Sequence, residues 1–291
     1  MTGRKQNSIG DRVLMALVFL FLYAPIIILI VFSFNAGTSS SVWKGFSLKW
    51  YESLLSNRLI MNSVYTTLMV SLLSTIVAAI AGTFAAIGLY AMSRRRRAVV
   101  NSVNNIPMMN ADIVTGVSLC LLFVVFFNGW GAFAGWVNSW QSAVVLPERL
   151  TMGFGTLLIA HITFDIPYVI LSVLPKIRQL DPNLAEAALD LGATPMTAFR
   201  KVVLPLSLPG VLSGITMVFV PSVSTFVISQ MLGSGKNLLV GDLIDLQFMG
   251  GAYNPHLGSA IALVMIILIF ICMWIMNKFD DGSSEEGGLL L

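Results

Sequence analysis

The sequence has little charge: Asp, Glu, Lys and Arg make up only 11% of its 291 residues. Soluble globular proteins carry roughly a quarter charged residues, so this chain lacks the polar surface that a soluble domain needs. Hydrophobic residues make up 56% of the chain, and the mean hydropathy is +0.85. The composition therefore excludes a soluble enzyme, a disordered chain and a coiled coil. It predicts an all-α membrane protein with a single polytopic domain.

Residues that carry enzyme chemistry are also scarce. The two cysteines, Cys120 and Cys272, lie in apolar runs without disulfide or metal-ligand spacing. The two histidines are too isolated to form a metal site with other ligands. The nearest approach to a phosphate-binding loop, at 233–237, lacks the first glycine and the final Ser or Thr. We therefore expect no catalytic residues, no metal and no cofactor bound by this chain. A net charge of +3 is too small to favour nucleic acid.

Six apolar segments are each about as long as a helix that crosses a bilayer. They lie near 13–34, 62–92, 106–127, 150–175, 209–233 and 257–277. No small-residue cleavage site follows the first, so it is interpreted as a retained signal anchor. The predicted organisation is a cytoplasmic N-terminus at 1–12, a six-helix transmembrane domain at 13–279, and a disordered acidic tail at 280–291.

The distribution of Lys and Arg predicts the orientation. With the N-terminus inside, the inner segments hold twelve of the seventeen basic residues and the outer segments hold five. Cytoplasmic loops carry such an excess, so both termini are expected in the cytoplasm. The run Arg94 to Arg97 is interpreted as a topology anchor. A site for lipid headgroups or nucleic acid is the alternative reading of the same run.

Small side chains recur every four residues along the second segment, at Ser74, Ala78, Gly82 and Ala86. Membrane helices associate by close backbone approach along such stripes. The stripe fits either packing within this chain or a seam, with a second membrane subunit or along a moving gate, and its spacing does not separate the two readings.

The inner segment between the fourth and fifth apolar runs carries strong local signals. Asp181 before a proline predicts a capped helix start, and Gly192 predicts the end of that helix. Thr194-Pro195 predicts a second short helix, which Pro205 is expected to end. We call residues 181–205 the elbow. Its apolar side chains indicate a docking element for a cytoplasmic partner, and they are Leu184, Leu191, Met196, Phe199 and Val203.

The elbow also carries a specific motif. Glu186-Ala187-Ala188 is followed after three residues by Gly192, after nine more by Val202, and then by Leu204-Pro205. Every spacing resembles the EAA loop of permease subunits of ATP-binding-cassette importers, with Val202 in place of Ile. Four further stretches, at 23–35, 46–51, 108–114 and 161–167, are similar to the second permease of spermidine/putrescine importers.

The resemblance implies the importer permease fold and a bacterial cell-membrane location. It implies a complex with a homologous permease subunit, two ATPase subunits that use the ATP, and an extracytoplasmic substrate-binding protein. It also implies that the loop at 176–208 couples this chain to an ATPase. The coupling residues would be Leu184, Glu186, Ala187, Ala188, Asp190, Gly192, Leu204 and Pro205.

Carboxylates inside the membrane segments are candidates for the substrate path. A charge at helix depth costs about 3 kcal/mol on insertion scales and usually faces a wet cavity or a partner. Asp165 is the main candidate, and a structural aspartate that is protonated or bonded to a Thr, to His161 or to a sister subunit is the alternative. Asp112 lines the path or simply caps its helix. Polar residues beside Pro221 complete the candidate path: Ser222, Ser224 and Thr225. Some relatives carry acidic residues at this last place, and this chain does not.

None of the six segments contains Lys or Arg, which favours a cation or a neutral solute over an anion. The leading hypothesis is a permease for a polyamine. The alternatives are a permease for another small solute of the same importer class, and a stand-alone secondary carrier. A secondary carrier usually shows inverted repeats, and none is visible here.

Overall fold

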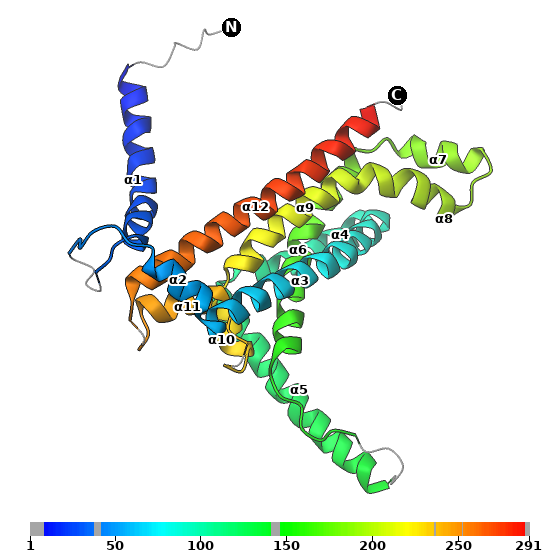
Figure 1. Ribbon diagram of the computed structural model, residues 1–291. Helices are drawn as coiled ribbons and strands as arrows, with labels where there is room; N and C mark the ends of the chain where they lie inside the picture. The colour runs from blue at the N-terminus through cyan, green and yellow to red at the C-terminus, as the bar shows by residue number, and fades with distance from the viewer. Residues whose placement is uncertain (1–8, 38–41, 141–145, 236, 252, 289–291) are drawn as a thin grey trace. The chain divides into compact units, whose positions relative to one another are not determined.

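The computed structural model describes residues 9–37, 42–140, 146–235, 237–251 and 253–288 (Figure 1). Its helices are α1 (Ile9–Ser33), α2 (Lys49–Ser56), α3 (Arg58–Ala91), α4 (Arg94–Met109), α5 (Asp112–Trp140), α6 (Phe154–Gln179), α7 (Pro182–Asp190), α8 (Pro195–Ala198), α9 (Leu204–Ser224), α10 (Val227–Leu232), α11 (Val240–Phe248) and α12 (Pro255–Gly288). A π-helical turn, Phe199–Val203, joins α8 to α9.

Six helical stretches in the described ranges are long and apolar enough to cross a membrane. They are Gly10–Ser33, Arg58–Ala91, Asp112–Trp140, Phe154–Gln179, Pro195–Ser224 and Pro255–Met276. They match the six predicted segments in order, which confirms the all-α membrane fold with six membrane helices.

The predicted start of the third segment, at 106, is wrong. Residues 94–109 form a separate helix, α4, which begins with the four arginines and contains Pro107 near its end. Asn110 then adopts an extended backbone with φ −85° and ψ 150°, and α5 begins at Asp112. Because Pro107 cannot donate a backbone hydrogen bond, it weakens the end of α4 and does not start the membrane helix.

The C-terminal segment differs from the expectation of disorder in the part that the structure describes. α12 continues as helix past residue 280 to Gly288. Gly282 does not interrupt it.

The structure divides into two compact units, formed by Met1–Met61 with Leu243–Ile267 and by Asn62–Asp242 with Leu268–Leu291. In the first unit, the Asn35 side chain accepts hydrogen bonds from the backbone N–H groups of Gly37 and Lys44, both at 3.0 Å. The Trp50 indole donates to the Asn35 carbonyl at 2.8 Å and stacks on His256. These contacts fix the loop after α1 against α2 and the start of α12.

The second unit has its core between α3, α6 and α9. Its buried side chains are Ala78, Ala86 and Leu89 from α3, Val169, Ile170, Val173, Leu174 and Ile177 from α6, and Val218 from α9. A Cβ atom built on Gly82 would lie 2.7 Å from the Val169 Cβ atom, which is closer than two non-bonded carbon atoms can approach. Only glycine allows α3 to lie this near to α6.

The small-residue stripe of α3 therefore packs within this chain. Ala78, Gly82 and Ala86 all contact the α6 side of the core. The fourth member, Ser74, lies 3.1 Å from the Ser222 hydroxyl of α9. Of the two readings that the spacing left open, the structure gives packing inside the second unit.

Candidate functional site

The elbow begins as the sequence predicts. The Asp181 carboxylate accepts a hydrogen bond from the Asn183 backbone N–H at 2.9 Å, which caps the start of α7. This side-chain cap satisfies one of the donors that every helix start leaves free.

The end of α7 is closed by Gly192, whose φ is +85°. The Gly192 N–H bonds to the Leu189 carbonyl at 2.9 Å, and the Ala193 N–H bonds to the Ala188 carbonyl at 3.0 Å. This pair of bonds is the Schellman motif, and the left-handed residue in it is usually glycine. A β-branched residue at 192 would be strained whatever space surrounds it.

The second half of the elbow corrects one prediction. Thr194 accepts a hydrogen bond from the Thr197 N–H at 3.3 Å and caps α8, as expected. Pro205 does not end a short helix, because the helical path runs from Pro195 through the π-helical turn to Ser224. In that turn the Leu204 N–H bonds to the Phe199 carbonyl, five residues back. The wider turn accommodates the missing N–H and the ring of Pro205, and such insertions are frequent at functional sites.

Most of the motif residues lie on the outside of the elbow. Leu184 is 45% exposed, and the neighbouring Leu191 and Met196 are 89% and 66% exposed. Glu186, Ala187, Asp190, Gly192 and Pro205 are exposed, while Ala188 and Leu204 are half-buried. Apolar side chains with so much exposure are available for contact with a partner. The two helices α7 and α8 lie side by side (Figure 1).

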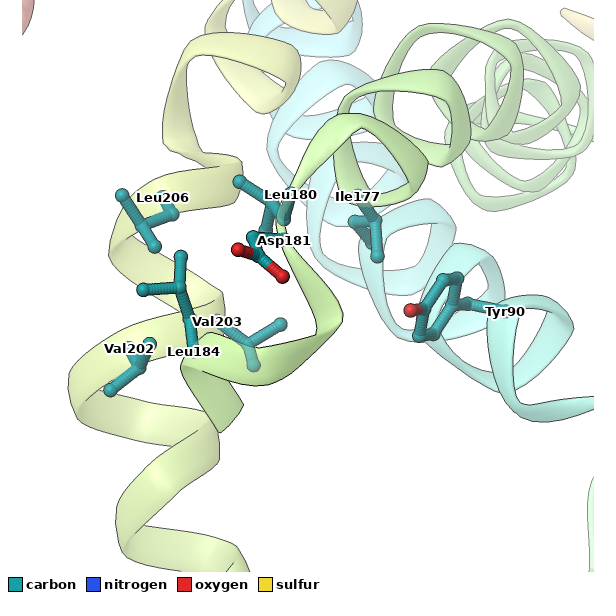
Figure 2. Close-up of a pocket in the computed structure, with 8 residues that line it drawn as sticks. All are labelled: Tyr90, Ile177, Leu180, Asp181, Leu184, Val202, Val203 and Leu206. Atoms are coloured by element: carbon teal, nitrogen blue, oxygen red, sulfur yellow. The ribbon is translucent and has the colours of Figure 1, made fainter. Parts of the chain in front are cut away.

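The base of the elbow packs against the ends of three long helices. A small pocket of about 50 Å³ lies there, lined by Tyr90, Ile177, Leu180, Asp181, Leu184, Val202, Val203 and Leu206. Figure 2 shows the Asp181 carboxylate and the Tyr90 hydroxyl facing the same space. Side chains from α3, α6, α7 and the π-helical turn therefore meet at the point where the elbow joins the membrane helices.

A second cavity, which we call the α6 cavity, lies in the same unit. It has a volume of about 110 Å³ and is lined by Asp112, His161, Phe164, Asp165, Tyr168, Val218, Pro221, Ser222, Thr225 and Ile228. One face of α6 supplies four of these residues, at 161, 164, 165 and 168. Their spacing of three and four residues places them on one side of the helix.

Four of the five predicted path residues meet in the α6 cavity: Asp112, Asp165, Ser222 and Thr225. Ser224 does not line it; its hydroxyl is exposed and donates to the Pro221 carbonyl at 3.3 Å. Asp112 is exposed and stands in the first turn of α5, where a negative charge is favourable. Asp112 therefore lies both in the first turn of α5 and in the wall of the cavity.

Asp165 is the most buried acid of the cavity, at 5% exposed. The Ser74 side chain interacts with its carboxyl group, and Ser74 in turn lies 3.1 Å from the Ser222 hydroxyl. The Asp165 Oδ2 atom has no hydrogen-bond partner among the described residues. Thr163 is not a partner, because its hydroxyl donates to the Ile159 carbonyl at 2.8 Å. Asp165, which lines the cavity, thus has a buried acceptor atom without a partner in the described part of the chain.

Sequence reasoning missed three residues of the cavity wall: His161, Phe164 and Tyr168. The sequence indicates His161 only as a possible bonding partner of Asp165 and not as a residue of the cavity wall. The signal for all three was present, because they share one face of α6 with Asp165. What the sequence did not give is which face of α6 turns toward α9 and α5.

Comparison with known proteins places these two regions in context. A family model described as "binding-protein-dependent transport system inner membrane component" matches residues 78–284. The spermidine/putrescine transport system permease protein PotC of Haemophilus influenzae is 34% identical over 254 residues, covering 87% of this chain and 90% of that protein. The putrescine transport system permease protein PotI of Escherichia coli is 32% identical over 280 residues, covering 94% and 93%.

Two solved structures share the fold. A bacterial transporter involved in the import of the acidic polysaccharide alginate matches with a TM-score of 0.73 at 16% identity, covering 94% of both chains. A chain of the inward-facing MetNI methionine transporter matches with a TM-score of 0.57 at 20% identity, covering 77% of this chain and 96% of that one. At these identities the likeness concerns the fold alone.

Proposed function

The chain belongs to the family of binding-protein-dependent transport system inner membrane components, and we propose that it forms half of the path by which an ATP-driven importer moves a polyamine. Members of this family are transport components of importers and not catalytic enzymes. The chain is accordingly a multi-pass protein of the bacterial inner membrane.

The proposal that the solute is a cationic amine rests on the α6 cavity. Its wall contains two acids, Asp112 and Asp165, and no Lys or Arg. A carboxylate that is 5% exposed, with one oxygen atom lacking a partner among the described residues, is costly unless something positive or hydrogen-bonding approaches it. Cationic amines fit this wall, and an anionic solute such as a polyuronate does not. The spermidine and putrescine permeases among the relatives agree with this choice.

The proposal that an ATPase drives the transport rests on the elbow. Its exposed Leu184, Leu191 and Met196 are available for contact, while its helix ends are capped internally. We propose that it seats in a groove of an ATPase subunit and passes the closure of that subunit to α6 and α9. The proposed assembly has a homologous permease, two ATPases and an extracytoplasmic binding protein. Both termini of this chain then face the cytoplasm.

The test is purification of the tagged chain from its own cells, followed by reconstitution in vesicles. We expect an ATPase and a second permease to co-purify. Vesicles supplied with ATP and the binding protein should accumulate labelled putrescine or spermidine. Accumulation of another solute and no polyamine would contradict the solute but keep the importer. Transport driven by an ion gradient without any ATPase would contradict both and favour a secondary carrier.

A further inference from the structure

A second residue that lines the α6 cavity also has a buried polar atom without a partner among the described residues. His161 is 1% exposed, and its Nδ1 atom lies 2.8 Å from the Leu157 carbonyl oxygen. A carbonyl oxygen only accepts, so the proton of the neutral ring is on Nδ1. Nε2 is then an acceptor with a free lone pair, and none of the described residues gives it a partner.

His161 and Asp165 lie one helical turn apart on α6, and both line the same cavity. Residues four apart lie on the same face of a helix. No hydrogen bond joins Nε2 to Oδ2, since each atom is without a partner in the described part of the chain. With Asp165 ionised, both atoms are acceptors and cannot satisfy each other. A single group that donates two hydrogen bonds would satisfy both atoms.

Unpartnered buried polar atoms are rare, and each calls for a specific explanation. Among the several such atoms in the described residues, these two belong to residues that line one cavity, which has room for several water-sized groups. Hydroxyl groups of Ser222 and Thr225 stand on the facing wall. Apart from Asp112, the rest of the wall is apolar or aromatic, with Phe164, Tyr168 and Val218 among its members.

We propose that His161 Nε2 and Asp165 Oδ2 together bind one primary ammonium group of the translocated amine. An ammonium group has three N–H donors. Two of them serve Nε2 and Oδ2, and the third serves a hydroxyl group of the facing wall. The adjacent apolar and aromatic side chains accommodate the methylene chain and attract a cation over their ring faces. This inference rests on the proposed function, because it requires an amine as solute.

The arrangement gives His161 a role in specificity rather than in attraction. Asp165 supplies the negative charge, which any cation would feel. His161 supplies a directed lone pair, which only a cation with N–H donors can use. A fully methylated ammonium group has no N–H and leaves Nε2 unpartnered.

The experiment compares two substitutions in the complete importer reconstituted in vesicles. His161→Phe keeps a ring of similar size but removes the acceptor, while His161→Gln keeps an acceptor on a different skeleton. A hydrogen bond to a charged group is among the stronger ones, so we expect His161→Phe to lower putrescine uptake about tenfold or more. We expect His161→Gln to retain most of the uptake. Both variants should co-purify with the ATPase.

Thr163→Val is the matched control. Thr163 lies on α6 between His161 and Asp165, but it is exposed and its hydroxyl is already bonded to Ile159. It does not line the cavity, so uptake should be unchanged.

The outcomes separate this inference from the proposed function. A wild-type complex that takes up no amine contradicts both. A wild-type complex active with putrescine, whose His161→Phe variant is equally active, contradicts the role of His161 alone and assigns the two atoms to ordered water. Equal loss in the Phe and Gln variants, with normal assembly, also overturns the inference, because it shows that only the shape of the ring matters. If the His161→Phe variant fails to assemble, the His161→Gln variant decides. Uptake retained by His161→Gln supports the inference, and uptake lost by an assembled His161→Gln complex overturns it.

Discussion

The elbow and the α6 cavity differ in which groups they expose and in which groups they leave without hydrogen-bond partners. The elbow exposes apolar side chains such as Leu191, at 89%, and satisfies its polar helix ends through the Asp181 cap and the Gly192 turn. The residues that line the cavity include buried polar side chains, and two of their atoms have no partner among the described residues. Apolar groups exposed on a rigid frame suit a protein partner, whereas buried polar groups without partners suit a small polar ligand.

The two regions also differ in what holds them in shape. Contacts between residues close in sequence fix the elbow: the hydrogen bonds at its helix ends span two to five residues. The cavity is assembled by helices far apart in sequence, as in the Ser74 to Ser222 contact between α3 and α9. A local substitution should therefore break the elbow at one point, while the cavity depends on the packing of α3 and α9 against α6.

The largest effect is expected at the turn of the elbow. Gly192 has φ +85°, and a β-branched residue held in that region costs about 1–3 kcal/mol. If this energy is taken from coupling, uptake should fall about 5–150-fold in Gly192→Val. Gly192→Asn is the matched control, because asparagine tolerates the left-handed conformation. It should retain most of the uptake.

The measurement is ATP-driven uptake together with the amount of protein in the membrane. Both variants should reach the membrane, since no atom outside the adjacent residues lies within 4 Å of a Cβ built at this position. Normal uptake in Gly192→Val would show that the geometry of this turn is not needed for coupling.

The second effect concerns the packing that supports the cavity. In Gly82→Ala the new Cβ atom would meet the Val169 Cβ at 2.7 Å and force α3 away from α6. Such overpacking typically costs about 1–3 kcal/mol. Gly88→Ala, six residues along the same helix, meets nothing within 4 Å.

Thermal unfolding in detergent distinguishes the pair. Gly82→Ala should unfold at a lower temperature than the wild type, and Gly88→Ala should be unchanged or slightly more stable because alanine favours helix. Equal stability of the two variants would mean that α3 does not approach α6 as closely as the structure shows.

The smallest effect is expected at the cap of α7. Asp181→Ala removes the acceptor of the Asn183 N–H and should cost about 1 kcal/mol of local helix stability. Asp181→Asn keeps a capping oxygen and serves as control. Hydrogen exchange of the α7 amides should be faster in Asp181→Ala only. Equal exchange in both variants and the wild type would exclude a role for this cap in holding the elbow.

The same contrast explains how much the sequence alone could predict. Asp181, Gly192 and Thr194 act within a few residues of themselves, so the start, the turn and the second cap of the elbow were predicted correctly. Pro205 was misread because the π-helical turn that accommodates it has no sequence signal of its own. The predicted start of the third membrane segment, at residue 106, was wrong for a related reason. Pro107 lies inside the polar helix α4, and hydropathy alone does not separate α4 from α5.

The cavity could be predicted only in part. Burial cost singled out Asp165, and its polar neighbours at 222 and 225 were named from their place beside Pro221. Their meeting with Asp112 depends on the rotation of α6 against α9 and α5, which no local pattern fixes. For that reason Ser224 was included although it faces away, and His161 was overlooked although it lies one turn from Asp165.

The central claim is that Asp165 meets the positive charge of the solute, and uptake by Asp165→Asn tests it most directly. Asparagine keeps the shape and the contact with Ser74 but removes the negative charge. If Asp165 meets a cation, polyamine uptake should fall about tenfold or more, as expected for a charged hydrogen bond, while assembly with the ATPase stays intact. Normal uptake by a well-expressed Asp165→Asn complex would contradict the claim and make Asp165 a structural residue of the α6 cavity.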